Sequence, residues 1–185
     1  MLGPARDVPL PGGAWEDLEN GLGVQLPDDY ERVLSAYAPV QLNVHLCLKH
    51  PSTPRWNLRE SMEHTISAFS RSDLSDARCP GFPDGPRFGG AAGLIPLTST
   101  DRGEHLFGAV DADSGEWRLP ACNGDEQDFH EYRMSFAGWL HRYLTGEDAF
   151  GPGSAVFHPG PVLFEGLPMT ASEHTTEWYG PERGM

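Results

Sequence analysis

The sequence predicts an α+β fold, a single domain in which helices pack on a mainly antiparallel sheet. Helical patterns come first along the chain, a β-meander follows, and one more helical pattern closes the domain near residue 146. Helices and strands that are segregated along a chain are typical of α+β domains. The length of 185 residues suffices for one well-buried domain and hardly for two.

The chain divides into three parts by composition. Residues 1–13 are rich in Gly and Pro and are expected to form a flexible arm, and residues 14–146 carry the α+β domain. Residues 147–185 form a Gly/Pro-rich extension with scattered apolar side chains. We expect this extension to dock partly on the domain, with one added strand, and to fray from residue 175 onward.

Two helices should open the domain as an αα-hairpin. Trp15, Leu18 and Leu22 recur with helical spacing, and Gly21 or Gly23 would end that helix. Pro27 then suits a first helical position, and three acidic residues in the next turn suit the positive end of the helix dipole. Tyr30 begins an apolar stripe that ends near residue 37, because Pro39 disfavours a helical residue before it.

The middle of the chain mixes one strand, one helix and a long loop. Val40 to Leu48 alternate apolar and polar residues over the whole run, which predicts one continuous strand. Asn57 with Glu60 resembles a capping box and starts a helical stripe that runs to Phe69. Residues 73–93 are irregular, and a loop of that length is either functional or mobile.

Strands dominate from residue 94 onward. Short strands are predicted at 94–97, with Pro96 at an edge or a strand end, and at 105–110, 116–120 and 128–133. Residues 111–115 carry the turn signal of a hairpin. The closing helix shows an apolar stripe from Phe136 to Leu144, between Ser135 and Gly146.

Composition excludes several functional classes. The formal net charge is −14, with 27 acidic residues against 13 Lys and Arg, which argues against binding to nucleic acid or an anionic membrane. The three cysteines form no Cys-x-x-Cys pair, so neither a disulfide framework nor a zinc ribbon is expected. No apolar run is long enough to span a bilayer, and the protein is expected to be soluble and cytoplasmic.

No catalytic or cofactor motif stands out. His45, Cys47 and His50 offer soft metal ligands, but on a strand His50 would face away from the other two. The segment starting at Asp111 departs from a calcium loop, because its sixth and twelfth positions hold Glu116 and Cys122. Asp101, Glu104 and His105 could be drawn as an acid/base cluster, yet such proximity arises by chance in so acidic a chain. We therefore expect no enzyme, metal or cofactor.

The acidic middle segment is the one candidate for binding a partner. Residues 101–133 hold 9 acidic and 3 basic residues, and a face of carboxylates there would steer a basic protein. The alternative is an ordinary solvated surface. The candidate residues are Glu104, Asp111, Asp113, Glu116, Asp125, Glu126 and Asp128.

Several blocks together resemble the SUKH superfamily, in its Smi/Knr-like branch. They are Trp15 and Leu18, the run from Gly23 to Tyr37 with its Leu26-Pro27-Asp28-Asp29-Tyr30 start, Leu94 to Leu97, Asp101 to Leu106, and Phe129 to Gly146. The resemblance covers about residues 14 to 146 and leaves the tail outside.

This resemblance implies a binding protein. Bacterial members of the superfamily are commonly immunity proteins that neutralise toxin domains, often nucleases, by direct contact, and fungal relatives regulate cell-wall synthesis through protein contacts. The family has no shared catalytic residues. We expect an immunity protein that binds a basic toxin domain, with a regulatory scaffold that binds a host protein or ligand as the alternative, and a hydrolase or metal enzyme as a third.

Overall fold

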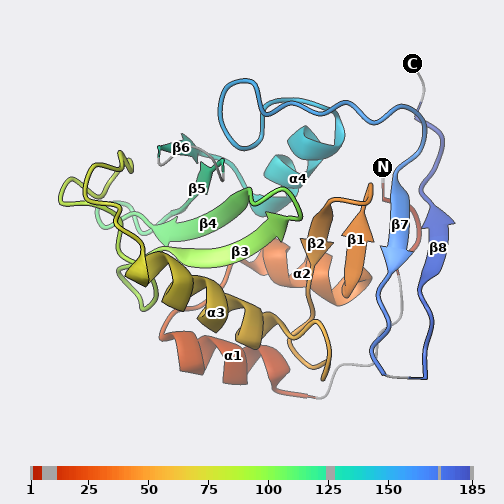
Figure 1. Ribbon diagram of the computed structural model, residues 1–185. Helices are drawn as coiled ribbons and strands as arrows, with labels where there is room; N and C mark the ends of the chain where they lie inside the picture. The colour runs from red at the N-terminus through yellow and green to blue at the C-terminus, as the bar shows by residue number, and fades with distance from the viewer. Residues whose placement is uncertain (1, 6–11, 124–127, 171, 184–185) are drawn as a thin grey trace.

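A single sheet of eight antiparallel strands organises the computed structural model, which describes residues 2–5, 12–123, 128–170 and 172–183. The strands are β1 (Val40–Leu42), β2 (Leu46–Leu48), β3 (Ile95–Thr100), β4 (His105–Val110), β5 (Trp117–Cys122), β6 (Phe129–Tyr132), β7 (Leu163–Gly166) and β8 (Thr176–Tyr179). Their order across the sheet is β6-β5-β4-β3-β2-β1-β7-β8 (Figure 1). Strands β1 to β6 form a meander, and the tail adds a hairpin beside β1.

Four helices accompany the sheet, and the predicted α+β architecture is confirmed. They are α1 (Ala14–Leu22), α2 (Asp28–Tyr37), α3 (Leu58–Arg71) and α4 (Phe136–Leu144). The first two form an antiparallel hairpin, since Trp15 near the start of α1 donates a hydrogen bond of 3.0 Å to Ser35 near the end of α2. Asn57 and Ser135 cap α3 and α4 as the sequence predicts.

The prediction of one continuous strand over residues 40–48 was wrong. The chain reverses between β1 and β2, where Asn43 and Val44 take positive φ angles of 47° and 69°. The His45 amide donates to the Leu42 carbonyl at 3.1 Å and closes this turn. In both β1 and β2 the leucines are buried and alternate with a more exposed residue. The apolar/polar alternation therefore continues through the turn, and the sequence pattern gave no sign of the reversal.

The tail also differs from expectation. It adds two strands where one was predicted, and residues 176–179 are paired with β7 as β8, whereas the sequence predicted fraying there. Trp178 stacks on Phe164 with ring centroids 5.1 Å apart, and Phe164 is fully buried. This aromatic contact fastens the last strand to the sheet.

Apolar clusters cover both faces of the sheet. In the main core, Leu97 and Leu106 join side chains of all four helices, including Leu58 and Met62 of α3. In a second cluster, Phe107 and Phe129 pack with Phe69, near the end of α3, and with the segment 74–94. The long loop predicted at 73–93 therefore covers the sheet, and Arg118 holds it by donating to the Pro80 carbonyl at 2.7 Å.

Helix α3 runs along the lower side of β3 in Figure 1, and α2 and α4 lie partly behind the strands. In the described part of the chain, no helix has the length and apolar character needed to cross a membrane.

Candidate binding surface

The acidic residues predicted to form one face lie at two ends of the sheet. Glu104 precedes β4, and Asp111 follows it. A strand of six residues spans about 20 Å, so these carboxylates cannot share a contact. Asp128 directly precedes β6, whose first residue pairs with Cys122 of β5. Cys122 in turn pairs with His105, the residue after Glu104, so Asp128 lies at the Glu104 end of the sheet. Asp125 and Glu126 lie outside the described residues.

Glu104 is occupied inside the protein. It is only 6% exposed, and its Oε2 atom accepts hydrogen bonds from Thr100 Oγ1 at 2.8 Å and from the Arg102 guanidinium at 2.9 Å. Asp128 is half-buried and accepts from the Arg78 amide at 3.3 Å. The prediction that Glu104 belongs to an open acidic face does not hold, because its carboxylate orders the β3–β4 turn.

The other end of β4 carries the exposed members of the predicted set. Asp111 Oδ1 accepts from the Asp113 and Ser114 amides and from the Ser114 hydroxyl, and these hydrogen bonds lower the pKa of Asp111. Asp113 and Glu116 are exposed, and neither takes part in an ion pair within the described part of the chain. The segment is a hairpin turn, as expected from its spacing.

An open cleft of about 330 Å³ adjoins this turn. It lies between the β4–β5 turn and the first residues of α2 and α4, and Trp117 forms part of its wall. Asp29 lies opposite and accepts from the Ala137 amide at 2.7 Å, so it caps α4 as well as opening α2. We call the cleft, with Asp29, Asp111, Glu116 and Trp117 in its lining, the acidic cleft.

Two arginines, Arg118 and Arg133, also line the acidic cleft, and both are already paired. Arg118 and Arg133 contact the two oxygens of the Glu131 carboxylate, each at 2.8 Å. Glu131 partly neutralises their positive charge, whereas Glu116, which lines the same cleft, takes part in no ion pair among the described residues. The cleft therefore presents net negative charge beside an aromatic wall, which suits a cationic side chain.

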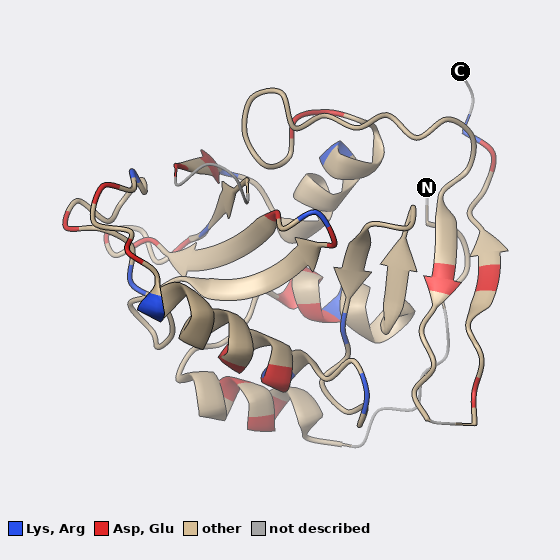
Figure 2. Cartoon of the chain, viewed as in Figure 1, with Lys and Arg blue, Asp and Glu red and all other residues tan. Residues whose placement is uncertain are grey.

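A second acidic area lies on neighbouring helices. Glu16 and Asp17 of α1 and Glu60 and Glu63 of α3 are exposed, and Figure 2 shows acidic positions on both helices. The helices are adjacent, because the Arg59 guanidinium donates to the Asp17 carbonyl. These acids lie at separate places in the sequence, and no local signal predicted their association.

The remaining chemical candidates separate in space. His45 Nδ1 lies 2.8 Å from Asp101 Oδ1, whereas His50 is buried and contacts Ser52. Burial raises the pKa of the Cys47 thiol, which disfavours a reactive thiolate. Among the described residues, no group of three His, Cys, Asp or Glu side chains could hold a metal ion.

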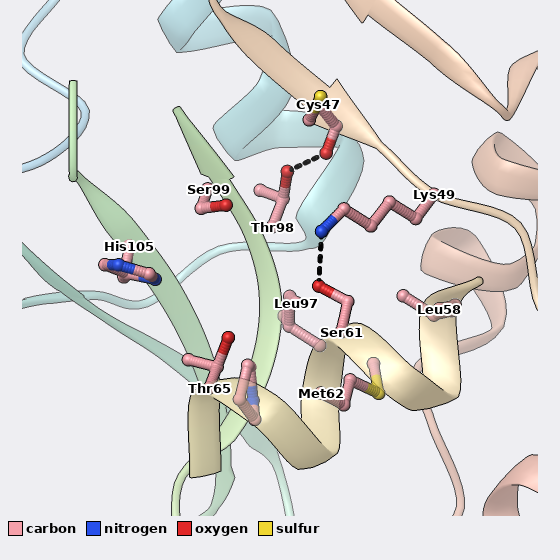
Figure 3. Close-up of a pocket in the computed structure, with 11 residues that line it drawn as sticks. Cys47, Lys49, Leu58, Ser61, Met62, Thr65, Leu97, Thr98, Ser99 and His105 are labelled. Atoms are coloured by element: carbon pink, nitrogen blue, oxygen red, sulfur yellow. Dashed lines mark hydrogen bonds between the residues drawn. The ribbon is translucent and has the colours of Figure 1, made fainter. Parts of the chain in front are cut away.

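A second cleft, which the sequence did not predict, lies between α3 and strands β2, β3 and β4. Lys49, Ser61, Thr65, Ser99 and His105 contribute its polar atoms, as Figure 3 shows. Lys49 Nζ donates to Ser61 Oγ at 2.5 Å. Burial and the charge of Lys49 lower the pKa of His105 to about 4, so its imidazole is neutral at pH 7.

A row of polar side chains continues from this cleft across the sheet. Strand register places Ser99, Cys47, Gln41, Glu165 and Glu177 opposite one another on successive strands. Glu165 and Glu177 are directly paired on β7 and β8, where like charges are unfavourable. This half of the sheet face is polar, in contrast to the aromatic half under residues 74–94.

Comparison with known proteins yields no assignment. No family model matches the chain, and no curated protein or solved structure is similar to it at a significant level.

Proposed function

We propose that this protein is a non-catalytic immunity protein that neutralises a basic toxin domain by binding it directly. The observation that carries the proposal is the acidic cleft, where Glu116 is exposed and unpaired in the described ion pairs, beside the aromatic wall of Trp117. A lysine or arginine of the partner would enter between the carboxylates and contact the indole. The resemblance of the chain to Smi/Knr-like proteins supports the same class of function.

Charge would act mainly on the rate of association. A net charge of −14 attracts a basic partner over distances set by ionic strength, and exposed acids at the contact orient the encounter. Neutralisation would be stoichiometric, because the bound protein covers the toxin surface and no turnover is involved.

The test is binding to the product of the adjacent reading frame, measured by calorimetry and by stopped-flow association at low and physiological salt. The double variant Asp113→Lys/Glu116→Lys reverses one charge in the lining of the acidic cleft and one in the adjoining turn. The matched control, Glu60→Lys/Glu63→Lys, makes the same change in net charge on α3. We expect the first variant to slow association about tenfold at low salt, and the control to slow it about twofold.

Equal effects of the two variants would show that only net charge matters and would overturn the assignment of the site. No binding to the adjacent product would overturn the immunity function. Binding to a host regulator, with none to a toxin, would support a regulatory scaffold instead.

A further inference from the structure

The cleft between α3 and strands β2, β3 and β4 has a composition unlike the rest of the chain. It contains Lys49, the only lysine of the protein, and no Asp or Glu is among the described residues that line it. In a chain with 27 acidic residues, this local excess of positive charge is a specific feature. We propose that this cleft binds the compact oxyanion group, carboxylate or phosphate, of a small ligand, with Lys49 as its charged contact.

Lys49 is placed to receive an anion. Its side chain extends from the end of β2 into the cleft, toward the α3 helix (Figure 3). The ammonium group has three N–H donors, and one of them reaches Ser61 Oγ at 2.5 Å. Lys49 is absent from the ion pairs of the described residues, so two donors stay available for a ligand.

Hydroxyl groups surround the ammonium with further donors. Because Ser61 accepts from Lys49, its own proton is free to turn toward a ligand. Thr65 and Ser99 also line the cleft, from α3 and β3. The Thr98 hydroxyl, by contrast, is committed to the Cys47 carbonyl at 2.7 Å. The available donors therefore come from elements on both sides of the cleft.

His105 completes the polar lining from β4. The pKa of His105 is about 4, so at pH 7 the neutral ring offers one N–H donor and adds no second positive charge against Lys49. Apolar atoms of Leu58, Met62 and Leu97 form the remaining wall. They lower the local dielectric constant and strengthen an ion pair formed beside them.

Three amides in the first turn of α3 are already used within the protein. The Leu58 amide donates to the His50 carbonyl at 3.0 Å, the Glu60 amide to Asn57 Oδ1 at 3.1 Å, and the Ser61 amide to the Asn57 carbonyl at 3.2 Å. These three amides are already committed, so the contacts that can be tested by substitution come from the side chains that line the cleft. The enclosed part of the cleft is only about 20 Å³, room for about one water-sized group, so one oxygen of the oxyanion would enter while the rest of the ligand stays in the open mouth.

The test is titration of the ¹⁵N-labelled full chain with sodium phosphate and, separately, with sodium acetate, followed by NMR at constant ionic strength. Sodium chloride is the reference for a general salt effect. We expect saturable shifts at Ser61, Thr65, Ser99 and His105, with the tighter of the two anions indicating a phosphate or a carboxylate ligand. Lys49→Met should weaken binding about tenfold, because it removes a charge-assisted contact.

Arg32→Met is the matched control, since Arg32 is exposed on α2 and its loss makes the same change in net charge. It should change the affinity less than about twofold. Ser99→Ala keeps the charge and should weaken binding about threefold, which tests the site even if Lys49→Met fails to fold. Linear, chloride-like shifts, or equal effects of Lys49→Met and Arg32→Met, would overturn the proposal. The proposed immunity function does not depend on this result.

Discussion

Replacing Glu31 by Gln should stabilise the protein at pH 8 and leave its stability almost unchanged at pH 4.5. Glu31 lies on α2 and faces Glu19 of α1, whose Oε1 atom accepts from the Leu26 amide at 2.6 Å. Burial, the hydrogen bond to Glu19 and the negative charges of Glu19 and Asp28 raise the pKa of Glu31 from 4.5 to about 7. Below about pH 7 Glu31 is protonated and can donate to Glu19, and above it Glu31 becomes charged beside Glu19.

The sign follows from proton binding in the two states. The folded-state pKa exceeds the unfolded value, so the native state binds more protons between pH 4.5 and about 7. The stability due to this group is therefore present below pH 4.5 and is lost as pH rises through 7. The amide introduced by Glu31→Gln would keep a donor to Glu19 at every pH and would not become charged.

The size of the effect follows from the same values. The whole difference in pKa corresponds to at most about 3 kcal/mol. Since Glu31 is partly exposed, water screens the interaction, and we expect a gain of about 1 kcal/mol at pH 8. For a chain of this size, that gain raises Tm by about 2–4 °C.

The assay is thermal and urea unfolding of wild type and Glu31→Gln at several pH values from 4.5 to 8. Glu182→Gln serves as the control, because Glu182 is exposed and the change removes one carboxylate away from the α1–α2 pair. The stability difference between Glu31→Gln and wild type should grow with pH, whereas Glu182→Gln should track wild type. A difference that stays constant from pH 4.5 to 8 would refute the reasoning.

Two further substitutions test the packing of α2 and the turn between β1 and β2. Tyr30→Phe removes a buried hydroxyl that donates to the Leu97 carbonyl at 2.8 Å, and should cost about 1–2 kcal/mol in urea unfolding; a neutral result would mean that this hydrogen bond contributes little. Val44→Gly should stabilise by about 0.5–1 kcal/mol, because Val44 is 48% exposed and holds a positive φ of 69° that a β-branched residue disfavours. A loss of stability in Val44→Gly would show that the side chain contributes more than the strain costs.

Local signals explain why most of the helices could be predicted. Gly23 ends α1, and Pro39 ends α2. Asn57 and Ser135 cap the starts of α3 and α4. Each of these residues acts on the backbone only a few positions away. The strands β4 and β5 follow from the turn at residues 111–115 in the same way. Where the determinant was not local, as in β8, the prediction was wrong, because Trp178 is ordered by a ring from another strand.

In the candidate sites, too, local features could be predicted from the sequence, whereas contacts between distant segments could not. Asp111 and Glu116 could be assigned to an exposed turn from their neighbours in the chain. That they line one cleft with Asp29 depends on the tertiary placement of α2 and α4 beside this turn. Glu104 illustrates the opposite error, since its acidic character is visible in the chain while its burial with Arg102 is not.

By itself, the sequence determined the α+β class, the helix boundaries and the acidic charge, because propensity, capping and composition are properties of short segments. Only the tertiary structure decided which side chains meet. Lys49, Ser61 and His105 come from β2, α3 and β4 or their ends, far apart in the chain, and a cleft exists among them because the sheet register and the crossing of α3 place them together. Long-range register is set by the whole buried core, which no segment of the chain contains alone.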